Sequence, residues 1–186
     1  MGTDKALITL GNDTWLAKTC QIALVCSIKV QIVTPWPEKY QAIIPPECEL
    51  IHEIPLLGEN INHGPLVGFA QGLAQVETEW VLLLACDLPC LEAQQLLEWC
   101  QHLNLAPNNV IALLPRQGER WEPLCGFYRR SCLPLLNQFI QQGGRSFQQW
   151  LRQYPVRELP VTNPRILFNC NTPKDLKMCY QNFKLF

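Results

Sequence analysis

The chain has 186 residues, of which 48% are hydrophobic, and its 15 basic and 16 acidic residues give a formal net charge of −1. This length is typical of one domain, so we expect residues 1–186 to form a single unit. The charge balance offers no excess of positive charge for nucleic acid or an anionic membrane surface. The longest apolar run, residues 80–86, is too short to cross a bilayer, and no secretory signal opens the sequence. We therefore expect a cytoplasmic protein that binds neither nucleic acid nor membrane.

Apolar patterning predicts helices and strands in alternation. Residues 29–34 alternate and stop at Pro35, which is typical of a strand, and Pro65 stands where a helix would open. Residues 80–86 are continuously apolar, as in a strand buried on both faces of a parallel sheet. In chain order we expect a helix at 13–26, strands at 29–34 and 49–51, a helix at 64–76, a strand at 80–86, a helix at 91–103, strands at 109–114 and 123–128, helices at 131–142 and 146–153, an edge strand at 156–161 and a helix at 173–180.

This order of elements predicts the fold class. Strands that alternate with helices favour an α/β fold with an open, mostly parallel, Rossmann-like sheet and helices on both faces. Such sheets bind ligands at the carboxyl ends of their strands. Polar residues that directly follow predicted strands are therefore the candidates for a site.

The ten cysteines do not indicate a metal site, because no CxxC pair occurs and no histidine has zinc-ligand spacing from a cysteine pair. Most of them lie in apolar runs. We expect buried thiols in a reducing compartment.

Asp87 is the strongest single candidate. It follows the apolar run that ends at Cys86 and precedes Leu88 and Pro89. A carboxylate at the carboxyl end of a buried strand can hold a divalent cation. The alternative is an aspartate that caps the next helix.

Gly64 and Lys5 are weaker candidates. Gly64 opens a helix, where unpaired N–H groups favour an anionic or polar ligand edge and glycine permits close approach, although an ordinary loop-to-helix junction explains it too. Lys5 could reach a phosphate as a point charge, or it could be a solvated lysine.

Asn169 and Asn171 follow an apolar stretch and are two residues apart, so on a strand they would point the same way. They could orient a metal or a phosphate. Alternatively, Asn171 or Thr172 caps the last helix. Arg145, after two glycines, could bind an anion or lie in a solvated turn.

Five segments in order carry a resemblance that no single residue carries. They are MGxDKAL at 1–7, GPLxG at 64–68, CDxP at 86–89, EPLxxxY at 122–128 and NxNTPxDL at 169–176. This set resembles the molybdenum cofactor guanylyltransferases over essentially the whole chain. The resemblance implies an enzyme that transfers GMP from GTP to the terminal phosphate of the molybdopterin cofactor and releases pyrophosphate. Molybdoenzymes or cofactor-delivery proteins would then be partners.

The resemblance also assigns residues. It places the phosphate-binding lysine of the family at Lys5 and its Mg²⁺-binding aspartate at Asp87. The acidic residue after the third strand aligns with Glu53, Gly64 lies in the cofactor-binding set, and Asn169 and Asn171 match the family's paired asparagines. Thr34 stands near the guanine-contacting strand end, where the family often has asparagine, so a related transferase that uses CTP or another acceptor stays an alternative.

The chain departs from the family at its start. Members begin with an apolar strand and a glycine-rich loop before the segment that matches Met1, so we expect the first strand to be missing from the sheet. Our interpretation is that Met1 is an internal methionine of a longer protein. The alternatives are an inactive paralogue that only binds the cofactor and a fold in which another element fills the gap.

Overall fold

The computed structural model describes residues 4–56, 64–170, 172, 174, 175 and 177. The helices and strands predicted within residues 13–161 are present with changes of boundary, and the α/β class is confirmed. The helices are α1 (Trp15–Leu24), α2 (Pro37–Tyr40), α3 (Pro65–Ala74), α4 (Ala93–Cys100), α5 (Leu133–Gln141) and α6 (Phe147–Leu151). The strands are β1 (Thr9–Leu10), β2 (Asp13–Thr14), β3 (Val30–Thr34), β4 (Cys48–His52), β5 (Trp80–Leu84), β6 (Ala112–Leu114), β7 (Arg116–Gln117), β8 (Arg120–Trp121), β9 (Cys125–Arg129) and β10 (Val156–Glu158).

Strand pairing is mixed. A four-stranded sheet has the order β10-β6-β9-β5, in which β9 is antiparallel to both of its neighbours and β10 is parallel to β6. Strands β3 and β4 form a separate parallel pair. The sheet is therefore less parallel than the alternation of helices and strands predicts, because β9 enters from a hairpin-rich segment and not through a helical crossover. Strand β10 is at the sheet edge, as expected from the prolines that flank it.

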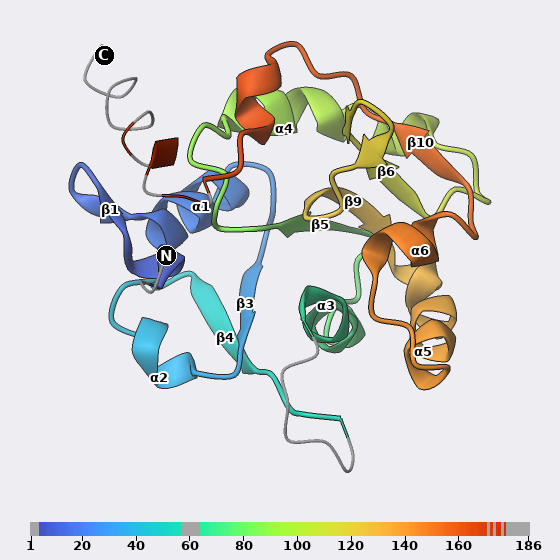
Figure 1. The fold of residues 1–186 in the computed structure, drawn as a ribbon, viewed down its shortest axis with the longest axis horizontal. Helices are drawn as coiled ribbons and strands as arrows, with labels where there is room; N and C mark the ends of the chain where they lie inside the picture. The colour runs from blue at the N-terminus through green and yellow to red at the C-terminus, as the bar shows by residue number, and fades with distance from the viewer. Residues whose placement is uncertain (1–3, 57–63, 171, 173, 176, 178–186) are drawn as a thin grey trace.

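Helices cover both faces of the four-stranded sheet, as predicted (Figure 1). One face packs against α3, α5 and α6 through a core that includes Leu66, Leu136 and Trp150. The opposite face packs against α4 and the end of α1, with Leu96 and Trp99 at its centre. Successive strand residues alternate between the two cores, which is the period of two that a pleated strand requires.

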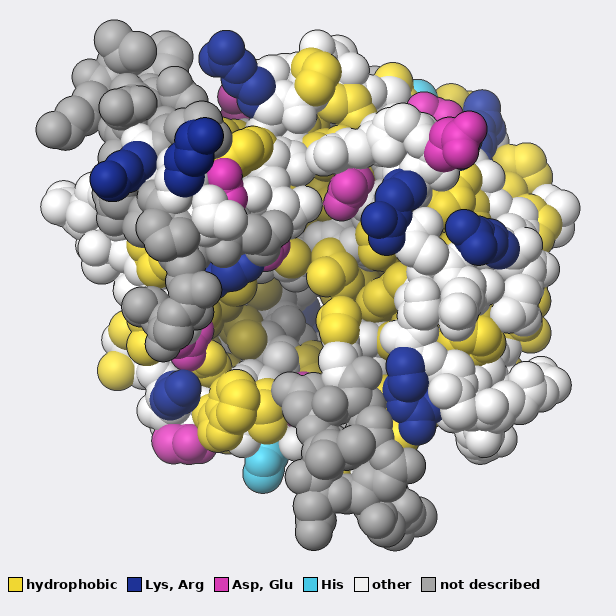
Figure 2. Space-filling view, viewed as in Figure 1, with side chains coloured by type: hydrophobic (Ala, Val, Ile, Leu, Met, Phe, Trp, Pro, Cys, Tyr) yellow, Lys and Arg dark blue, Asp and Glu magenta, His cyan; other side chains and the backbone are white. Residues whose placement is uncertain are grey.

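Strand β5 is less buried than its apolar sequence predicts. All five of its residues are only partly buried, whereas β9 is buried throughout. The reason is the strand order: β5 is the last strand of its sheet, and among the described residues no ladder of hydrogen bonds joins it to β3. Both faces of β5 pack on the cores, but its residues are only partly buried and its neighbour β9 is antiparallel, so the expectation of a strand buried within a parallel sheet is wrong. Seen from the same direction as in Figure 1, the molecular surface has a hollow near its middle, with hydrophobic side chains in its walls (Figure 2).

Local sequence signals explain several element boundaries. The Thr14 side chain accepts a hydrogen bond from the Ala17 N–H and caps α1, so the helix begins at Trp15, two residues later than predicted. Pro65 is in the first turn of α3, as predicted. The short hairpin β1–β2 before α1 was not predicted, although Gly11 has the positive φ of 70° that such a turn favours. The C-terminal helix predicted at 173–180 lies mostly outside the described residues.

Candidate active site

The structure brings Lys5 and Asp87 together. Lys5 opens η1 (Lys5–Leu7), a short 3-10 helix, and its Nζ lies 3.1 Å from Oδ2 of Asp87. The two side chains are 29% and 21% exposed, so the pair is at the surface but is shielded on most sides. These residues are 82 positions apart in the sequence, and their meeting depends on the tertiary fold alone.

The loop after β5 holds Asp87 in place. Leu88 and Leu91 are buried in the core beneath it, and the Asp87 carbonyl accepts a hydrogen bond of 3.1 Å from the Cys170 N–H. That bond ties the loop to the chain segment that carries the NxNTP motif. Cys170 and its neighbour Asn169, which belong to the described part of the motif, therefore lie close to the Asp87 loop.

Asn169 and Glu122 lie next to this pair. A hydrogen bond joins their side chains, and Glu122 is close enough to Asp87 for its pKa to respond to the Asp87 charge. Burial, with a smaller contribution from Asp87, raises the pKa of Glu122 above its usual value, although Arg120 and Asn169 oppose the shift. The sequence analysis included Glu122 only as the first residue of the EPLxxxY motif and predicted no role for it. Its place in that motif was the one sequence feature that could have indicated a role.

The other predicted site residues lie on other parts of the fold: Glu53 directly follows β4, and Gly64 precedes α3. The Glu53 N–H donates to the Thr34 carbonyl oxygen at 2.8 Å, and the Glu53 carboxyl group lies against α3, where a Cβ on Gly68 would come within 3.3 Å of its carbon. Gly64 precedes α3 with φ of 80°, a conformation that requires glycine at that junction. Asn171 lies outside the described residues. Arg145 donates to the Ile140 and Gly144 carbonyl oxygens at the end of α5.

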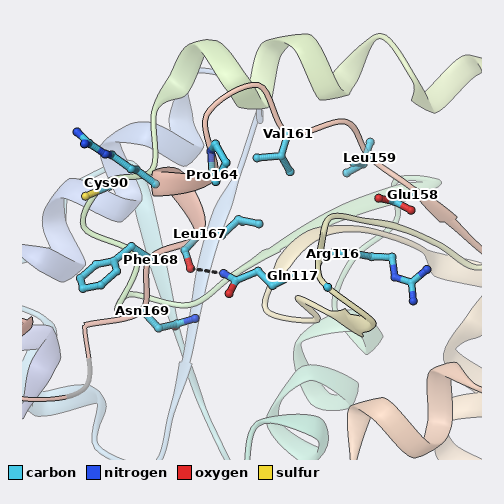
Figure 3. Close-up of a pocket in the computed structure, with 12 residues that line it drawn as sticks. Cys90, Arg116, Gln117, Glu158, Leu159, Val161, Pro164, Leu167, Phe168 and Asn169 are labelled. Carbon is cyan, nitrogen blue, oxygen red and sulfur yellow. Dashed lines mark hydrogen bonds between the residues drawn. The ribbon is translucent and has the colours of Figure 1, made fainter.

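A pocket of about 960 Å³ opens beside Asn169 (Figure 3). Apolar walls come from the segment after β10 and from η4 (Pro164–Leu167), and its polar lining includes Arg116, Gln117, Glu158, Arg165 and Asn169. Gln117 is fixed by a 2.7 Å hydrogen bond from its Nε2 to the Leu167 carbonyl oxygen. Arg116 stacks 4.7 Å over the Trp121 ring, and its Nε is buried without a hydrogen-bond partner in the described part of the chain. A buried N–H of this kind is costly unless a ligand accepts from it.

The cysteines form no disulfide among the described residues, and no group of three or more His, Cys, Asp or Glu side chains there could by itself hold a metal ion. Burial raises the pKa of Cys20, Cys125 and Cys132 to about 12. These thiols are therefore protonated at neutral pH, as expected for packing residues. No helix in the described ranges has the length and apolar character to span a membrane.

An α/β fold with a lysine and an aspartate paired at the carboxyl end of a strand, next to an open pocket, fits the class of nucleotidyltransferases. The chain belongs to the family defined by the MobA-like NTP transferase domain, whose model matches residues 1–158. The resemblance drawn from the five sequence motifs is thereby confirmed.

Two curated relatives and one solved structure illustrate this similarity. A "Probable molybdenum cofactor guanylyltransferase" of Nostoc sp. strain PCC 7120 is 54% identical over 183 residues, which are 98% of this chain and 86% of the relative. A protein with the same name from Synechococcus elongatus is 39% identical over 175 residues, 94% of this chain and 89% of the relative. The crystal structure of molybdopterin-guanine dinucleotide biosynthesis protein A from Archaeoglobus fulgidus has a TM-score of 0.78 at 23% identity and covers 100% of this chain and 93% of its own. This last similarity concerns the fold.

Proposed function

We propose that this chain transfers GMP from GTP to the terminal phosphate of the molybdopterin cofactor and releases pyrophosphate. The observation that carries the proposal is the Lys5–Asp87 pair, 3.1 Å apart at the carboxyl end of β5. The names of the curated relatives, at 54% and 39% identity, support the choice of substrates.

In this reaction the acceptor phosphate attacks the α-phosphorus of GTP in line, a new P–O bond forms, and the bond to the β-phosphate breaks. Phosphoryl transfer of this type depends on positioning and charge neutralisation and needs no protein nucleophile. Lys5 exchanges its contact with Asp87 for one with a phosphate oxygen of the bound triphosphate. Its ammonium group then stabilises the negative charge that grows on the leaving pyrophosphate.

Asp87 would hold Mg²⁺, and the donor set fits that ion. Mg²⁺ is commonly bound by one or two carboxylates together with substrate phosphates, so a site without three clustered protein ligands suits it better than it would suit zinc. When bound, the ion would neutralise phosphate charge next to Lys5. Asn169 lies beside the pair with its amide held by Glu122, which favours a role in orienting the same phosphates.

The pocket beside Asn169 is suited to the acceptor. Its apolar walls would accept a flat heterocycle, and Arg116 and Arg165 in its lining would attract the anionic end of the cofactor. The donor nucleotide and the acceptor would thus approach Asp87 from two sides.

The test is pyrophosphate release by this chain with GTP, molybdopterin cofactor and Mg²⁺. We expect release that requires all three, with GTP preferred over CTP. Arg116→Ala should raise KM for the cofactor about tenfold and leave KM for GTP unchanged, because one charged hydrogen bond is lost at the acceptor side only. Arg157→Ala, which changes an arginine outside the pocket lining, is the matched control. A preference for CTP would refute GMP transfer, and cofactor binding without pyrophosphate release would indicate a binding protein.

A further inference from the structure

A series of polar contacts connects the end of β3 with the loop after β5, although these strands belong to different sheets. Thr34, the last residue of β3, forms a side-chain hydrogen bond with Tyr40. The Tyr40 hydroxyl donates to Oδ2 of Asp4 at 2.8 Å. Asp4 directly precedes Lys5, whose ammonium reaches Asp87. The contacts therefore end at the two charged groups of the candidate site.

Asp4 is held on both of its carboxylate oxygens. Oδ1 accepts from the Ala6 N–H at 3.1 Å and caps η1, and Oδ2 accepts from Tyr40 and, at 3.3 Å, from Nζ of Lys39. Burial alone would raise the pKa of Asp4, but the hydrogen bonds from Tyr40, Lys39 and Ala6 lower it below its usual value. Asp4 is thus ionised, and several hydrogen bonds hold it at the start of η1, the short helix that begins with Lys5.

Apolar packing also connects the two groups of strands, but it is less specific. Helix α1 packs on the β3–β4 pair through residues such as Leu16 and Cys20 and reaches the core of the four-stranded sheet through Ile22, and α3 contacts both β3 and that sheet. Apolar contacts of this kind have no preferred direction. Hydrogen bonds depend on angle and distance, so the polar series can fix the orientation of η1 where packing alone cannot.

We infer that Asp4 and Tyr40 are positioning residues for Lys5: the Tyr40–Asp4 hydrogen bond fixes η1 and so places the Lys5 ammonium over Asp87. This inference rests on the proposed role of Lys5 in GMP transfer. A lysine side chain is flexible and its charge is compact, so the placement of its backbone decides where the charge can be used. A displacement of about 1 Å at a reacting group can cost on the order of 100-fold in rate.

The first test reads the position of Lys5 without any turnover. An amine-acylating reagent is applied to the intact protein, and the rate of Lys5 modification is followed by peptide mass spectrometry. Tyr40→Phe keeps the buried ring and removes only the hydroxyl group. We expect it to raise the Lys5 modification rate about threefold to tenfold, as the loss of one hydrogen bond to a charged group allows. Tyr154→Phe is the matched control. Its ring centroid lies 6.0 Å from that of Trp150 in α6, and the substitution should leave the Lys5 modification rate unchanged.

The second test is a double-mutant cycle on pyrophosphate release. Tyr40→Phe should lower kcat about tenfold in the native background and less than twofold in a Lys5→Ala background, because a residue that acts through Lys5 has nothing to act on once Lys5 is gone. Asp4→Asn should retain more activity than Asp4→Ala, since its single amide oxygen can still make one of the two contacts, either the cap of η1 or the hydrogen bond from Tyr40. Asp4→Ala removes both contacts, and it replaces Tyr40→Phe as the test if that variant does not fold.

An unchanged Lys5 modification rate in Tyr40→Phe and Asp4→Ala, or an equal loss of kcat in both backgrounds, would overturn the inference. Failure of the proposed function looks different: the native chain would release no pyrophosphate, while the modification experiment would still report on the position of Lys5.

Discussion

The Lys5→Ala substitution should lower the rate of the reaction strongly and change the stability of the fold only slightly. The Lys5–Asp87 pair is 3.1 Å long, but its side chains are 29% and 21% exposed, so water screens part of the attraction. Partly exposed ion pairs contribute at most about 1 kcal/mol to folding, which in a chain of 186 residues corresponds to about 2–4 °C in the melting temperature. Removing one preorganised charge from a transition state costs far more, on the order of 100-fold to 1,000-fold in rate.

The assay is pyrophosphate release measured beside a thermal melt of the same samples. Lys29→Ala is the matched control, because Lys29 forms a surface ion pair of 2.7 Å with Glu49 and the substitution removes the same charge away from the site. We expect a loss of at least about 100-fold in kcat/KM for Lys5→Ala and none for Lys29→Ala, with small shifts in melting temperature for both. A Lys5→Ala variant that retains rates within about fivefold of the native chain would refute the reasoning, since the charge would then not act in the transition state.

Three further predictions follow from packing and protonation. Gly126→Ala would place a Cβ 2.6 Å from the Leu113 carbonyl oxygen between two strands. The protein should lose about 1–3 kcal/mol of stability, which corresponds to a fall of about 2–12 °C in the melting temperature. An unchanged melting temperature would contradict this close approach. Because the pKa of Glu122 is raised in the fold, the native state binds its proton more tightly than the unfolded chain, and stability is lost as pH rises from about 4.5 through the raised value. Glu122→Gln should therefore stabilise the protein at pH 7.5 more than at pH 4, and a benefit that grows toward low pH would reverse the assigned sign. The thiols of Cys125 and Cys132, with pKa about 12, should resist iodoacetamide at pH 7.5 until the chain is unfolded; rapid modification in the native state would show them to be accessible.

The local sequence predicted those features that local chemistry decides. Thr14 and Pro65 are typical of helix starts, and the alternation of residues 30–34 indicates a strand. Such signals can be read locally because helix caps and periodicity depend on only a few neighbouring residues. The same local reasoning correctly predicted β5 as a strand but overestimated how deeply its residues are buried. A continuous apolar run does not say whether a strand has a neighbour on each side, and within the described residues β5 pairs with β9 alone.

The candidate site was predicted in part for the same reason. Asp87 follows an apolar strand, so its place at the sheet edge could be anticipated from its neighbours in the sequence. Its contact with Lys5 joins residues 82 positions apart and came from motif order alone. The Tyr40–Asp4 hydrogen bond spans 36 positions, and although Asp4 lies in the first motif, Tyr40 lies in none, so only the fold reveals this bond.

The central claim is that Lys5 and Asp87 together receive the triphosphate. A crystal structure of the chain with Mg²⁺ and a GTP analogue that carries a methylene group between its α- and β-phosphates tests it most directly. We expect the Lys5 ammonium to have left Asp87 for a phosphate oxygen, with the Asp87 carboxylate bound to the metal. A nucleotide bound elsewhere, with the Lys5–Asp87 pair still closed at about 3.1 Å, would contradict the claim.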